Sequence, residues 1–154
     1  MYNFVDQPGS RLTDGSHFLL WAMRGWALSA NQSRCPTVTL APSFAPLGML
    51  ETLNDFHELM IGCRSFGMCR LTFGALDQPR IMESEAIMLA LWADVATGRI
   101  ERARTVLALM IAEPYVAEVI ARMARMTNHM TKLGLAPTGL RQGAQAPQPS
   151  GRPG

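Results

Sequence analysis

The spacing of apolar side chains along the chain predicts five amphipathic helices. Apolar residues that recur at steps of three and four positions mark one face of a helix. This spacing runs through five segments: residues 17–30, 46–67, 81–98, 100–112 and 115–133. Each segment ends at, or is followed by, a glycine, a proline or a polar turn. We therefore expect an all-α fold, a compact bundle of about five helices with disordered termini.

The clearest apolar stripe lies in the second of these segments. Its residues alternate steps of four and three: Met49, Leu53, Phe56, Met60 and Cys63. Acidic residues at positions 51, 55 and 58 fall off the stripe and should face water. We expect this helix to include Pro46 in its first turn, where the missing N–H costs nothing, and to end in a left-handed cap at Gly67.

Two stretches between the helices lack helical spacing. Residues 32–46 contain three prolines and the β-favouring run Val38-Thr39-Leu40, so we expect an extended connector with at most a short strand. Residues 68–80 contain Gly74 and Pro79, which break regular structure, so this stretch is expected to be irregular.

The two ends of the chain also lack periodicity. Residues 1–13 are polar, and residues 135–154 are rich in Pro, Gly and Gln. Such composition cannot bury enough apolar surface to offset the entropy of ordering, so both ends are predicted to be disordered. The helical domain should therefore span residues 14–134, with Asp14 or Ser16 capping its first helix.

The chain is more apolar than a small bundle requires. Apolar residues make up 48% of the sequence and charged residues only 17%, whereas charged residues are about 25% of a typical soluble domain. The first predicted helix is apolar nearly all round, with Arg24 as its only charged residue, which is typical of a central helix. A single core need not hide so many apolar side chains. We therefore expect Leu19, Met23 and Trp26, on its second apolar flank, to contact a protein partner or a second copy of the chain.

The formal net charge of +2 is distributed unevenly along the chain. Residues 1–98 carry six Arg against nine acids, and residues 99–154 carry eight basic residues against three acids. Five basic residues would share one face if the last two helices pack antiparallel: Arg99, Arg102, Arg122, Arg125 and Lys132. Such a face suits the phosphates of DNA, so a DNA-associated regulator is the alternative function. We favour a protein partner, because the pI of 8.6 lies below the value of about 9 that marks nucleic-acid-binding domains.

The sequence carries no signature of catalysis or of a metal site. Cys63 and Cys69 are six positions apart, wider than the cysteine pairs that begin structural zinc sites, and Cys35 and His57 complete no such pattern. The histidines fall in three different predicted helices: His17, His57 and His129. We therefore expect no catalytic residues, no metal and no cofactor, and leave open whether the three cysteines have a redox role.

Targeting signals are also missing from the sequence. The first 13 residues contain no basic start followed by an apolar run, so we expect no secretory signal. The longest apolar stretch, Phe18–Met23, is far shorter than the roughly 20 residues that span a bilayer. Three cysteines cannot all pair with one another, so we expect reduced thiols and a cytoplasmic location.

Three segments carry a resemblance to other proteins: Leu20-Trp21-Ala22-Met23-Arg24-Gly25-Trp26, Asn54-Asp55-Phe56-His57-Glu58-Leu59-Met60 and Glu85-Ala86-Ile87-Met88-Leu89. In their order, from Phe18 to Leu135, they resemble a group of small, uncharacterised alphaproteobacterial helical proteins. That group has a Cys-x-Cys motif where this chain has residues 75–79, so no thiol-based role is carried over. The resemblance implies a bacterial, cytoplasmic, helical protein and no activity. The sequence thus favours a non-enzymatic interaction or regulatory protein that binds a partner or itself.

Overall fold

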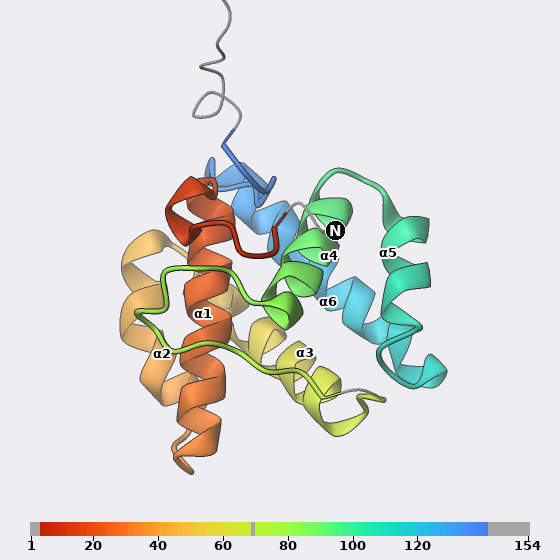
Figure 1. The fold of residues 1–154 in the computed structure, drawn as a ribbon, viewed down its shortest axis with the longest axis horizontal. Helices are drawn as coiled ribbons and strands as arrows, with labels where there is room; N and C mark the ends of the chain where they lie inside the picture. Colours follow the sequence, from red (N-terminus) through yellow and green to blue (C-terminus); the bar gives the residue numbers. More distant parts are fainter. Residues whose placement is uncertain (1–3, 69, 142–154) are drawn as a thin grey trace, which may run out of the picture.

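Six α-helices build the described part of the chain, residues 4–68 and 70–141, in a computed structural model (Figure 1). They are α1 (Asp14–Asn31), α2 (Pro36–Phe44), α3 (Leu53–Ser65), α4 (Glu83–Ala96), α5 (Ile100–Leu107) and α6 (Val116–Lys132). Short 3-10 helices lie at Gly9–Arg11, Ala45–Leu47, Leu50–Thr52 and Glu113–Tyr115. The all-α prediction is confirmed, with one more helix than expected.

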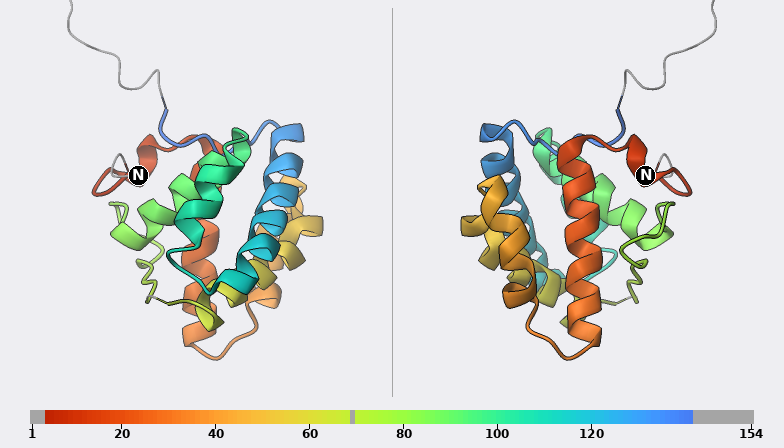
Figure 2. Two further views of the ribbon diagram at one scale, coloured as in Figure 1. Left: turned by 90° about the vertical axis from the view of Figure 1, so that its right-hand side faces the viewer. Right: turned by 90° about the vertical axis from the view of Figure 1, so that its left-hand side faces the viewer.

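The two long helices, α1 and α6, each pack against three others (Figure 2). α1 contacts α2, α3 and α4, and α6 contacts α3, α4 and α5. Because α3 and α4 contact both long helices, they join the two halves of the bundle. The nearly all-round apolar pattern of α1 follows from this position, since a helix covered on several sides has little surface left for polar residues.

The helix α2 lies where an extended connector was predicted, so that prediction is wrong. Pro36 occupies the first turn, where its lack of an N–H removes no hydrogen bond. Leu40 and Phe44 are buried, and the Phe44 ring packs against Phe18 of α1 with ring centroids 4.9 Å apart. Burial of these two side chains outweighs the weak helix propensity of Val38 and Thr39, which amounts to a few tenths of a kcal/mol per residue.

The predicted helix over residues 46–67 is divided in the structure. Two 3-10 turns precede α3, yet every residue of the predicted stripe, from Met49 to Cys63, is buried. Gly67 is not in the left-handed conformation expected of a cap; it forms an antiparallel β-bridge with Ile111 instead. The helix-ending roles of Gly98 and Gly134 are supported by their φ angles of 83° and 77°, which glycine adopts without strain.

The two ends of the described chain pair with each other. Leu12 and Leu140 form an antiparallel bridge, and Gly139 accepts a hydrogen bond from the Thr13 N–H at 2.7 Å. Ser16 does not cap α1; its buried hydroxyl accepts the Gly139 N–H at 2.9 Å. These two ends lie side by side in Figure 1. The prediction of disorder is therefore wrong for residues 4–13 and 135–141. These residues are held by contacts between the two ends of the chain, and such contacts leave no local periodicity in the sequence. Residues 1–3 and 142–154 lie outside the described residues.

Candidate functional site

The three side chains predicted to contact a partner are in the core. Leu19 and Met23 are 0% exposed and Trp26 is 4% exposed. The indole N–H of Trp26 donates to Nδ1 of His57 in α3 at 3.0 Å, which shows that α3 covers this end of α1. The prediction of a contact surface at Leu19, Met23 and Trp26 is therefore wrong, because neighbouring helices of the same protomer cover both flanks of α1.

Two of the five predicted basic residues, both on α6, are directed toward α3. The guanidinium groups of Arg122 and Arg125 each lie 2.9 Å from Asp55 Oδ1, and Arg122 also lies 3.2 Å from Glu118. The hydrogen bond from Arg125, together with the positive charges of both arginines, holds the pKa of Asp55 below its ordinary value. This cluster joins α3 to α6 and neutralises part of the charge predicted for a DNA-binding face.

The other predicted basic residues lie elsewhere. Arg99 and Arg102 lie 3.9 and 3.5 Å from the carboxylate of Asp94 in α4. Lys132 is exposed in the last turn of α6. Four of the five predicted side chains are thus divided between two carboxylates on different helices, and the DNA-binding alternative stays a prediction.

Two of the three histidines hold elements together. His57 accepts the Trp26 N–H, and His129 contacts the Gly48 carbonyl oxygen through Nε2 at 2.7 Å and a Glu51 carboxylate oxygen through Nδ1 at 2.9 Å. The third, His17, is exposed in the first turn of α1.

The cysteines occupy separate places. Cys35 is exposed at the start of α2, where a hydrogen bond with Thr37 lowers the pKa of its thiol, and Cys63 is buried on the stripe of α3. Cys69 lies outside the described residues. Within residues 4–68 and 70–141, no group of three His, Cys, Asp or Glu side chains could hold a metal ion.

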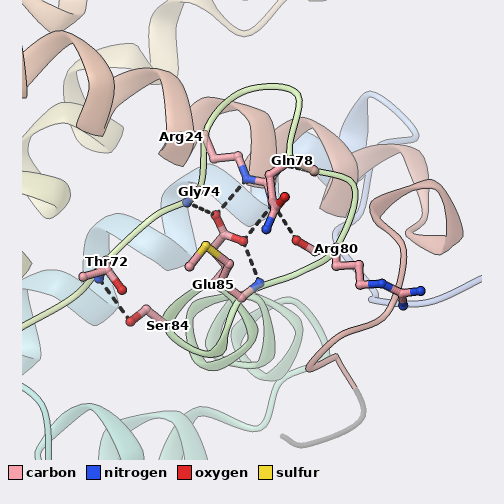
Figure 3. Close-up of polar contacts among 8 residues, drawn as sticks. Arg24, Thr72, Gly74, Gln78, Arg80, Ser84 and Glu85 are labelled. Carbon is pink, nitrogen blue, oxygen red and sulfur yellow. Dashed lines mark hydrogen bonds and ion pairs between the residues drawn. The ribbon is translucent and has the colours of Figure 1, made fainter.

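A buried ion pair, which the sequence analysis missed, joins α1 to the start of α4 (Figure 3). Arg24 and Glu85 are 4% and 0% exposed. Glu85 accepts two hydrogen bonds from Arg24, at 2.7 and 2.9 Å. It also accepts the backbone N–H groups of Gly74 and Met82, at 2.7 and 2.8 Å. The available signal was Arg24 itself, the single charged residue in an otherwise apolar helix.

Arg24 uses two further donors on the irregular segment before α4, residues 70–82, which we call the long connector. It donates to the backbone carbonyls of Gln78 at 2.8 Å and Arg80 at 3.0 Å. One ion pair therefore satisfies four backbone groups of the long connector, in addition to both charges (Figure 3). Because the long connector is irregular, these bonds replace those that a helix or sheet would supply.

The ordered long connector forms one wall of a pocket of about 410 Å³. The other walls are the C-terminal halves of α1 and α3. The lining residues are Trp26, Ala27, Asn31, Met60, Cys63, Arg64, Arg70, Leu71, Thr72 and Phe73. The set includes two arginines and no acid.

A second feature is an exposed apolar cluster where the chain after α3 meets the turn between α5 and α6. Its members are Phe66, Met68, Leu109 and Tyr115, which we call the aromatic junction. The rings of Phe66 and Tyr115 stack with centroids 3.6 Å apart and planes inclined by 8°. All four are exposed: Phe66 by 39%, Tyr115 by 37%, Met68 by 61% and Leu109 by 75%. The apolar excess noted in the sequence is therefore partly exposed here, away from α1.

No helix in the described parts of the chain is both long and apolar enough to cross a membrane. Comparison with known proteins found no matching family model, no matching curated protein and no matching solved structure. The resemblance to alphaproteobacterial helical proteins stays a prediction.

Proposed function

We propose that the protein is a non-enzymatic interaction domain that associates with a second copy of itself through the aromatic junction. The observation that carries this proposal is the stacked Phe66–Tyr115 pair, both residues of which remain more than one third exposed. Aromatic residues and Met are enriched at protein interfaces. Covering such side chains contributes about 25 cal/mol for each Å² of apolar surface removed from water.

The junction is held in place before any partner binds. The N–H of Met68 donates to the Met110 carbonyl at 2.7 Å, and the N–H of Ala112 donates to the Phe66 carbonyl at 3.0 Å. These bonds flank the bridge between Gly67 and Ile111. A fixed surface loses less conformational freedom on association than a mobile one, so more of the contact energy contributes to affinity.

The charges beside the junction favour a second copy as the partner. In the antiparallel register of the bridge, Glu113 lies beyond one end of the paired segments and Arg70 beyond the other. Both side chains are exposed. A two-fold interface uses the same patch on both subunits. A two-fold axis perpendicular to the line from Glu113 to Arg70 would therefore place Glu113 of each protomer opposite Arg70 of the other.

The proposal includes a bacterial cytoplasmic location, which the small number of cysteines and the Arg-rich composition support. A binding role rather than catalysis is supported by His57 and His129, because Nδ1 of His57 and both ring nitrogens of His129 are used in contacts between elements of the fold.

Sedimentation equilibrium of the wild-type chain and two charged variants tests the proposal. Leu109→Asp should convert a dimer to a monomer, because it puts a carboxylate into the apolar contact. Val38→Asp is the matched control: Val38 is 71% exposed but lies on α2, away from the junction. We expect Val38→Asp to remain dimeric. A wild-type chain that is monomeric at about 1 mM, where even a weak interface would form, would overturn the proposal, as would a dimer unaffected by Leu109→Asp.

A further inference from the structure

The pocket beside Trp26 has the dimensions of a small-molecule site. Its volume of about 410 Å³ lies within the range of about 300–1,000 Å³ typical of ligand pockets. Its floor is apolar: Trp26, Met60, Leu71 and Phe73 line it, and all four are buried or half-buried. The apolar or aromatic part of a ligand could therefore pack against this floor.

The two charged side chains of the pocket lining are both arginines. Arg64 lies 5.8 Å from the centroid of the Trp26 ring, and its one hydrogen bond to another described residue is a long contact of 3.4 Å to Asn31. Arg70, also in the lining, has no hydrogen bond or ion pair to the described residues. A guanidinium carries five N–H donors, so both arginines retain most of their donors for a ligand. With no acid in the lining, a cationic ligand would find no counter-charge.

The wall that carries Arg70 is fixed without a ligand. The N–H of Thr72 donates to Oγ of Ser84 at 3.1 Å, and the N–H of Gly74 donates to Glu85 at 2.7 Å. The wall is thereby tied to α4 and to the buried ion pair (Figure 3). A pocket that exists before binding needs little reorganisation to accept its ligand.

We propose that this pocket binds a small aromatic or apolar compound with one anionic head, a carboxylate or a phosphate. The apolar body lies on Trp26 and Phe73, and the head accepts hydrogen bonds from Arg64 and Arg70, as arginine binds both kinds of oxyanion through paired N–H groups. This site is distinct from the aromatic junction but shares Arg70 with the charge contact proposed for self-association, so binding is also measured on the monomeric Leu109→Asp chain.

Titration followed by nuclear magnetic resonance tests the assignment with matched probes. Indole-3-acetate and indole-3-acetamide share a body and differ in charge; phenyl phosphate and phenol form the phosphate arm. We expect each anion to bind at least about tenfold more tightly than its neutral partner, a difference of about 1.4 kcal/mol. The indole N–H signal of Trp26, assigned with Trp26→Phe, should move. Whichever anion binds more tightly identifies the head group.

Three variants locate the anion. Arg64→Gln and Arg70→Gln should each weaken binding of the anionic probe about fivefold or more, with little effect on the neutral probe. Arg104→Gln is the matched control and should bind like the wild type, because Arg104 is a half-buried arginine on α5 outside the pocket lining. The monomeric Leu109→Asp chain should still bind, which separates this site from the proposed function. Equal affinity for charged and neutral probes, or unchanged binding by both pocket variants, would overturn the inference.

Discussion

Removing the charge of Glu85 should destabilise the fold more than any other single charge change in the described chain. In Glu85→Gln the amide can no longer neutralise Arg24, which stays 4% exposed in the core. In either orientation the amide NH₂ must also face two donors, Arg24 and the backbone N–H of Gly74 or Met82. Breaking a buried pair by removing one partner costs about 3–5 kcal/mol. The total stability of a single domain is about 5–15 kcal/mol, so this loss is a large share of it.

Urea unfolding followed by circular dichroism measures the effect. With a slope of about 2 kcal/mol per M, the midpoint should fall by roughly 1.5 to 2.5 M. Glu83→Gln is the matched control, since Glu83 lies in the same first turn of α4 but is exposed. It should cost at most about 1 kcal/mol, the value of an exposed acid at a helix N-terminus.

The double variant Arg24→Met/Glu85→Met separates two roles of the pair. If its only role were mutual neutralisation, replacing both charges by apolar groups would restore most of the stability, as apolar replacements of buried ion pairs often do. The structure predicts otherwise, because four backbone groups of the long connector would lose their partners, at about 1–3 kcal/mol for each group left buried. A double variant as stable as the wild type, or a Glu85→Gln cost below about 1 kcal/mol, would refute this reasoning.

Three further predictions concern stability and are measured by the same unfolding assay. Asp55→Asn should cost about 1 kcal/mol near pH 7. Because the folded pKa of Asp55 is lowered, its stabilisation is present above the unfolded pKa and is lost as pH falls through the folded value, so wild type and variant should converge at acidic pH; a difference independent of pH would contradict this. Gly15→Ala should destabilise the fold by about 1–3 kcal/mol, since its Cβ would collide with the carbonyl group of Leu135. Gly62→Ala is the control, because this position has room for a methyl group. Equal costs of the two substitutions would contradict the packing of the C-terminal segment against α1. Leu40→Ala should cost about 2–5 kcal/mol, because Leu40 is buried on α2; a negligible cost would mean that α2 is not packed as described.

The sequence by itself determined the helical class and most of the core. The stripe from Met49 to Cys63 is buried although two 3-10 turns interrupt its first part. Periodicity succeeds here because a helical face is set by residues three and four positions apart, within one local segment. The irregular segment before α4 was predicted for a similarly local reason, its Gly and Pro residues.

Only the tertiary structure decided which apolar side chains are covered. The pattern of α1 is compatible with burial on one flank or on both, and packing of α2, α3 and α4 around it buried Leu19, Met23 and Trp26. The pairing of the chain ends and the Arg24–Glu85 bond join residues more than sixty positions apart. Such contacts leave no periodic trace, because each depends on where two distant segments meet in space. The same holds for the pocket and the aromatic junction, whose residues come together from separate helices and turns.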